Sequence, residues 1–150
     1  MSTETQKQDK LVTMAGKEKA LKNLFTSVFG YLAVGYNIDT NGGNGFVNPS
    51  DENPNSGFNE ITLEEDSTYH RVPLTPNENV KKNPETGEVT VSFLAELDVD
   101  NIIDSNIPIN QIAIFDSEEV GSGTMYCAGT SSDFPKNEEL ALIFVIDMMM

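Results

Sequence analysis

The chain has 150 residues with one Cys, so it is the size of one ordinary domain and no intrachain disulfide can form. Hydrophobic residues make up 38%, with eight Phe, four Tyr and no Trp, which favours a β-rich core over a disordered chain. The net charge of −15 repels phosphate backbones and anionic lipid, so we predict no nucleic-acid partner and no membrane partner.

The charge is unevenly distributed along the chain. Residues 1–25 carry five Lys against three acidic residues, whereas residues 26–150 carry four basic against twenty-one acidic residues. Residues 1–12 are polar and lack the apolar run of a signal peptide, so we expect a flexible N-terminal arm. The longest apolar stretch, Leu140 to Ile146, is too short to span a bilayer, and we expect a protein made and assembled in the cytosol.

A helical pattern follows the arm. Glu18 and Lys22 are spaced to pair across one turn, and Gly30 is a natural helix stop. The apolar positions near helical spacing are Met14, Leu21, Leu24, Phe25, Val28 and Phe29. The spacing predicts an amphipathic helix over 13–29, which opens a single domain over 13–150.

The rest of the chain reads as short strands separated by turns rich in Gly, Pro and Asn. Expected strands are 31–37, 61–63, 68–75, 88–99, 108–116, 123–130 and 139–148, with a long loop at 37–59 and a turn region at 76–87. Pro73 indicates an edge strand or a bulge. The segment 88–99 has the clearest alternation of apolar and polar residues. We predict a mainly β fold, an antiparallel β-sandwich of jelly-roll or Ig-like type with one N-terminal helix.

The last expected strand differs from the others. It is apolar on both faces, so we expect it in the middle of a sheet or at an interface. Three Met residues follow it directly and end the sequence, where flexible thioether side chains would pack on the core or on a neighbouring subunit. The residues predicted to form an interface are Leu21, Leu24, Phe25, Phe29, Met148, Met149 and Met150.

Catalytic patterns are weak. Asp66, Ser67 and His70 contain the elements of a hydrolase triad, but no nucleophile signature accompanies them, and a polar cross-strand contact accounts better for His70. The neighbouring pairs Glu64 with Glu65 and Glu118 with Glu119 point to opposite faces of a strand. We therefore predict that the protein is not an enzyme.

Cofactor patterns are weak as well. The oxygen-rich sets Asp98, Asp100, Asn101, Asp104 and Asp39, Asn41, Asn44 lack EF-hand spacing, and turn-forming residues explain them. The segment NGGNG at 41–45 lacks the Lys and Ser/Thr of a P-loop. Cys127 has no basic neighbour in sequence and is expected to be a buried, inert thiol. We predict no cofactor and no metal.

The segments YLAVG, YHRVPLT, VTVSFLAEL, INQIAIFD, GTMYCAGT and FPKNEELALIFVI follow one another in an order that resembles small β-sandwich virion structural proteins of tailed bacteriophages. The resemblance runs from about Leu21 to Asp147, with the Asn-rich loop at 37–59 unmatched. Matching positions are Tyr69, Arg71, Val72, Ala113, Ile114, Phe115, Asp116, Gly123 and Gly129. They look like scaffold residues, with Phe115 expected between the sheets and Asp116 at the start of a turn. The resemblance implies a virion component and no catalytic residue.

Four functions are weighed on this basis. A capsid decoration or head-surface protein, docked in many copies, comes first, and a tail or baseplate adaptor is close behind. In both cases the expected partners are other virion proteins, such as major capsid or tail proteins, and further copies of the chain in a homo-oligomer. A carbohydrate- or receptor-binding module would use the loops at 37–59 and 100–107, where Phe46 and Phe58 are the aromatics of the first. A DNA-mimicking inhibitor is the least favoured, because the acidic residues are scattered.

Overall fold

The structure is a computed structural model that describes residues 11–37, 58–61, 63–65, 68–69, 71–97, 108–134 and 142–150. Its order is one helix followed by nine strands, counted over these residues. The chain is mainly β, with a four-stranded and a three-stranded antiparallel sheet and a single N-terminal helix, as in a β-sandwich. The arm predicted at 1–12 lies almost entirely outside the described residues.

The helix α1 spans Met14–Asn23 and continues as one wide turn, η1, over Leu24–Val28. The hydroxyl of Thr13 accepts a hydrogen bond from the Gly16 amide at 3.0 Å and so caps its first turn. Gly30 follows the end of this segment. Only glycine fits there, because a Cβ atom would lie 2.7 Å from the Thr26 carbonyl oxygen. The helix predicted over 13–29 is confirmed.

The three-stranded sheet contains β5 (Thr75–Asn83), β6 (Glu88–Leu97) and β9 (Leu142–Met149), in that order. Its inner face is the alternating apolar row of β6, fully buried as predicted. The residues of this row are Val89, Val91, Phe93, Ala95 and Leu97. The side chains between them lie on the opposite face, which we call the outer face of the sheet.

The strand β5 was not predicted, and the expectation of a turn region at 76–87 is wrong over most of its length. The turn is confined to 84–87, where Gly87 has φ 76°. Pro76 and Asn residues argue against a strand, but pairing with β6 overrides them, and the register shift between Pro76 and Val80 accommodates the proline.

The four-stranded sheet has the order β4-β1-β7-β8. The bounds are Val72–Pro73 for β4, Tyr31–Gly35 for β1, Ile109–Phe115 for β7 and Met125–Phe134 for β8. Pro73 lies on its edge strand, as predicted. Two further short strands, β2 (Glu64–Glu65) and β3 (Thr68–Tyr69), pair with each other.

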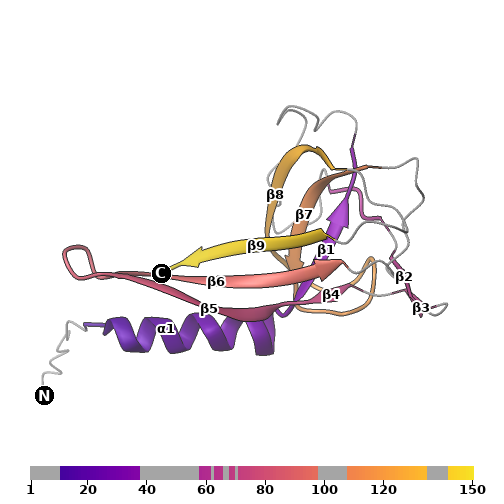
Figure 1. Cartoon of the computed structure of the whole chain (residues 1–150). Helices are drawn as coiled ribbons and strands as arrows, with labels where there is room; N and C mark the ends of the chain where they lie inside the picture. Colours follow the sequence, from indigo (N-terminus) through magenta and orange to yellow (C-terminus); the bar gives the residue numbers. More distant parts are fainter. Residues whose placement is uncertain are drawn as a thin grey trace, which may run out of the picture.

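The helix lies along the three-stranded sheet. The strands of the four-stranded sheet cross the direction of β6 and β9 at the end away from the β5–β6 turn (Figure 1). The main core lies among these three layers. Phe25 of the helix contacts Phe93 of β6 and Tyr126 of β8 edge to face, with ring centroids 5.5 and 4.8 Å apart. Leu32 and Ile114 complete the core from the four-stranded sheet.

A second, smaller core lies on the other face of the four-stranded sheet. It contains Phe115 with Ala33, Ala113 and Met125, and Phe58 packs against it. Phe115 is fully buried, but the expectation that it packs between the two sheets is wrong. Its neighbour Ile114 faces the main core, so the alternation of the strand places Phe115 on the opposite side.

The packing of Phe25 gives a stability prediction. Phe25→Ala should lower the free energy of unfolding by about 3–5 kcal/mol, because it leaves a cavity beside Phe93. Val28→Ala, a substitution at a nearby exposed residue, is the control and should change the free energy of unfolding by about 0.5 kcal/mol or less. Urea unfolding followed by circular dichroism measures both values. An equal, small effect at the two positions would contradict the core assignment.

Candidate functional site

The residues singled out for chemistry from the sequence lie mostly outside the described part of the chain. His70, Asp66 and Ser67 lie there, as do both oxygen-rich sets, the NGGNG segment and Phe46. Glu118 and Glu119 are described and are exposed in the turn between β7 and β8. Among the residues described, no three His, Cys, Asp or Glu side chains group as metal ligands.

The largest buried side chain is charged. Arg71 is 1% exposed and forms a bidentate ion pair with Glu60, with Nε–Oε2 and Nη2–Oε1 distances of 2.9 and 2.8 Å. Its Nη1 donates to the carbonyl oxygens of Ser117 and Ser122 at 3.0 and 2.7 Å. The guanidinium also stacks on Phe115, 3.7 Å from the ring centroid.

This arrangement is structural. Glu60 also accepts a hydrogen bond from the Gly121 amide at 3.1 Å, so both ends of the ion pair hold the turn between β7 and β8. The same turn closes through Asp116, whose carboxylate accepts from the Thr124 amide at 2.6 Å, which confirms that Asp116 starts a turn. Because Arg71 is enclosed and its donors are used within the chain, it has no surface on which to bind a ligand.

Two buried side-chain amides, of Asn110 and Gln111, bind the backbone at the other end of the four-stranded sheet. Asn110 donates to the Asn37 carbonyl oxygen at 2.8 Å and accepts from the Asn37 amide at 3.0 Å. The Gln111 side chain accepts from the Asn59 amide at 2.9 Å. These bonds position the segment around residue 59 against β1, so they too belong to the scaffold.

One group of exposed apolar side chains lies on the outer face of the three-stranded sheet. Ile143, Val145 and Met149 of β9 are 62%, 61% and 63% exposed. They alternate with the half-buried Leu142, Phe144, Ile146 and Met148, which pack toward the main core. The pairing places Leu94 beside Val145 and Glu96 beside Ile143 on this face.

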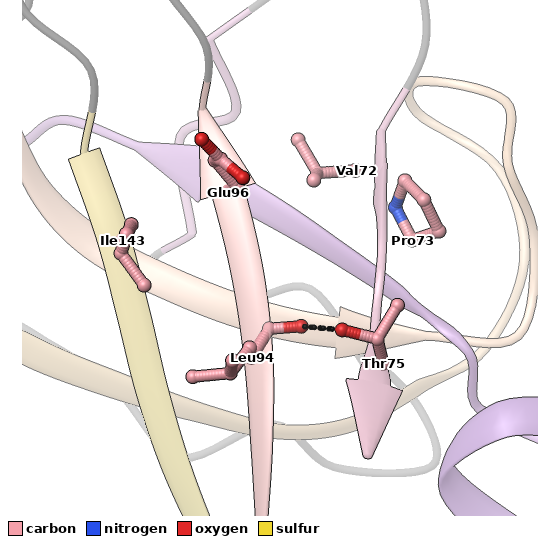
Figure 2. Close-up of a pocket in the computed structure, with 6 residues that line it drawn as sticks. All are labelled: Val72, Pro73, Thr75, Leu94, Glu96 and Ile143. Atoms are coloured by element: carbon pink, nitrogen blue, oxygen red, sulfur yellow. Dashed lines mark hydrogen bonds between the residues drawn. The ribbon is translucent and has the colours of Figure 1, made fainter. Parts of the chain in front are cut away.

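A hollow of about 240 Å³ lies where this outer face meets the edge of the other sheet. Figure 2 shows Glu96 and Leu94 of β6 beside Ile143 of β9, with Val72 and Pro73 on the other side. The Thr75 hydroxyl donates to the Leu94 carbonyl oxygen at 3.4 Å across the hollow's floor. The lining is mainly aliphatic with one carboxylate, which suits an apolar side chain of a partner better than it suits a reaction.

The residues predicted as an interface divide into two groups. Leu21 and Phe25 are buried in the chain's own core, and Leu24, Phe29 and Met148 are partly buried against it, so the helix face is occupied by β6 rather than open to a partner. Met149 and Met150 are exposed and remain candidates. Ile143 and Val145 were missed as named residues, although the two-sided apolar pattern of this segment pointed to them.

Cys127 is partly buried, and burial raises the pKa of its thiol. The Glu18 carboxyl has a lowered pKa because Lys22 and then Lys82 donate hydrogen bonds to it. Lys17 donates to the Gly87 carbonyl oxygen at 2.8 Å. Lys17 and Lys82 therefore tie the helix to the β5–β6 hairpin, whereas Lys22 pairs with Glu18 within the helix.

No helix among the described residues has the length and apolar character needed to cross a membrane. The comparisons with known proteins found no matching family model, no matching curated protein and no matching solved structure.

Breaking the buried ion pair should be costly. Arg71→Met should lower the free energy of unfolding by about 3–5 kcal/mol, because Glu60, itself only 11% exposed, keeps its charge without its partner. Adding Glu60→Gln should recover part of that loss. The exposed substitution Lys81→Met serves as the control and should have an effect within about 0.5 kcal/mol. Urea midpoints that coincide for Arg71→Met and Lys81→Met would refute this role.

Proposed function

We propose that the protein is a non-enzymatic structural component of a tailed-phage virion that docks on other virion proteins through the outer face of its three-stranded sheet. A capsid decoration or head-surface position is the first form of this proposal, and a tail or baseplate adaptor is the second. The observation that carries it is the exposure of Ile143, Val145 and Met149 on one face of one strand.

Ile143 and Val145 of β9 lie next to each other on the outer face with Leu94 of β6 beside them, and Met149 follows after Asp147. Such a group differs from isolated exposed hydrophobics, which are common on any protein. Grouped apolar surface costs free energy in water and is typical of an interaction site. The hollow beside Ile143 and Leu94 gives this face relief into which a partner's side chain can insert. The pattern favours binding to a protein surface over binding to a small polar ligand.

The charge distribution fits docking on one face. On the outer face of β6 and β9, the described charged side chains are Glu88, Glu96 and Asp147, and the Ser92 hydroxyl donates to Asp147 at 2.5 Å. The apolar side chains Ile143, Val145 and Leu94 lie together between these charges. A partner would therefore meet an apolar centre with acidic residues around it.

The resemblance of the segment order to phage virion proteins supports the particular setting. The matched Arg71, Phe115 and Asp116 are scaffold residues in the structure, in keeping with an assembly protein whose function lies in its surface. The carbohydrate-binding alternative depends on loops that lie largely outside the described residues and stays a prediction.

A test of docking uses Leu94, which lies on the outer face of the middle strand β6. Leu94→Glu should lower incorporation into particles at least about tenfold, since it places a charge in the docking patch. Thr130→Glu adds the same charge at an exposed position of β8 and should leave incorporation unchanged. Quantitative mass spectrometry of particles purified from the phage that encodes the chain measures both, with unfolding curves to check that each variant is folded.

The same measurement separates the two forms of the proposal. On the order of hundreds of copies per particle indicates a head or tail lattice, whereas about six or twelve copies indicate the neck or baseplate. Absence of the unmodified chain from purified particles would refute both forms.

A further inference from the structure

Among the described strands, β9 lies at an edge of its sheet, and we call its unpaired side the open edge. It pairs with β6 on one side, and no described strand pairs with its other side. Its eight residues hold one charge, Asp147, with no Pro and no Lys, and the pairing with β6 runs from Thr90 to Leu97 without a register shift. A long, regular, apolar edge of this kind is what soluble proteins normally avoid, because it offers free backbone donors and acceptors to another chain.

The opposite edge of the same sheet is protected. Strand β5 carries Pro76, a register shift before Val80, and the charged pair Lys81 and Lys82. Lys82 is further tied to Glu18 of the helix at 2.9 Å. The edge at β5 therefore has a proline, a register shift and two lysines against further pairing, whereas β9 has Asp147 alone, so its edge is the one suited to pair with another strand.

An apolar groove of about 220 Å³ lies beside this edge, on the inner side of the sheet. Its walls come from β7, β8 and β9. They include Ile112, Ile114, Cys127, Gly129, Ile146 and Met148. A strand added to β9 would point every second side chain in the same direction as Ile146, and so into this groove.

We propose that β9 pairs in antiparallel fashion with β9 of a second copy of this chain, joining two three-stranded sheets into one six-stranded sheet. The proposal deepens the assembly function proposed above and rests on it, since it identifies the first partner of the subunit. The pairing is isologous about a twofold axis, so each copy gives and receives the same contacts.

The composition of β9 is what selects a second copy as the occupant. The groove requires an extended segment with apolar residues at alternate positions, and Phe144, Ile146 and Met148 supply that pattern on the inner side. Because β9 is also apolar on its outer face, pairing extends the docking patch across both copies. An antiparallel pair of identical strands fills both grooves at once.

Asp147 limits the register of this pairing. A pair centred on Asp147 would place two carboxylates directly opposite each other, which is destabilising. Centring on Val145 or Ile146 places Asp147 opposite Ile143 or Val145 of the second copy instead. Two copies of β9 can therefore pair without bringing their acidic residues together, although the whole chain carries a charge of −15.

The size of the contact sets its strength. Eight residues span roughly 27 Å, and an edge about 10 Å thick covers roughly 270 Å², well below the roughly 800 Å² per partner of a stable complex. We therefore expect a dimer that dissociates on dilution, with the groove as its decisive contact.

Cross-linking tests the register directly. In the Cys127→Ser background, either Val145→Cys or Ile146→Cys should form a disulfide-linked dimer under mild oxidation, because each places its own thiol opposite itself in one of the two registers. Glu96→Cys, on β6 and one strand away from the edge, is the control and should remain monomeric. The full chain is used throughout.

Filling the groove tests its role. Gly129→Phe should raise the dimer dissociation constant at least about tenfold in sedimentation experiments, since a new side chain occupies the space of the incoming one. A Cβ atom at Gly129 would lie 3.7 Å from Ile112, an ordinary contact, and an unfolding curve of the variant checks that the ring leaves the fold intact. Thr130→Phe, at the next and exposed residue, is the control and should leave the constant unchanged.

The native thiol gives a third readout in the unmodified chain. Cys127 lines the groove, so its alkylation rate should fall as protein concentration rises and the groove fills. A chain that stays monomeric with no cross-link at Val145 or Ile146, or that cross-links equally at Glu96, would overturn the pairing. A monomer that is still incorporated into particles would refute the pairing alone, whereas a dimer absent from particles would refute the virion function alone.

Discussion

The ion pair between Arg71 and Glu60 holds together segments that the two sheets alone do not join. It lies beneath the turn that follows β7, beside the small core around Phe115, and one residue before β4. Leu74 then separates β4 in one sheet from β5 in the other, and its amide donates to the Gly30 carbonyl oxygen at 2.8 Å. The chain therefore passes from one sheet to the other at Leu74, held by the buried Arg71 on one side and by the Gly30 carbonyl at the end of the helix on the other.

This scaffold determines which surfaces remain free. The helix covers the inner face of β5 and β6. Its apolar residues, which the sequence had suggested as a docking surface, are therefore part of the core or packed against it. The four-stranded sheet covers the inner residues of β9 only in part, which leaves the groove beside Ile146 and Met148. The outer residues of β9 have no cover among the described parts of the chain. The proposed docking and pairing surfaces are two sides of this one strand.

Local patterns predicted the regular elements well and the irregular ones poorly. The helix and the strand β6 were predicted because their apolar residues follow one period without interruption. Strand β5 was missed because Pro76 and its Asn neighbours are turn formers, and only pairing with β6 makes the segment extended. Phe115 was placed on the wrong side because alternation does not say which face of a strand meets the larger core.

The sequence by itself determined the fold class, the helix, the long central strand and the conclusion that the last apolar segment belongs either inside a sheet or at an interface. The tertiary structure excluded the middle of a sheet, since among the described strands β9 lies at an edge with apolar side chains of its outer face exposed. The physical reason is that periodicity records which residues avoid water, whereas strand order determines which neighbours are present to exclude it. That order depends on contacts between segments far apart in the chain, such as Ser92 with Asp147 and Arg71 with Ser122.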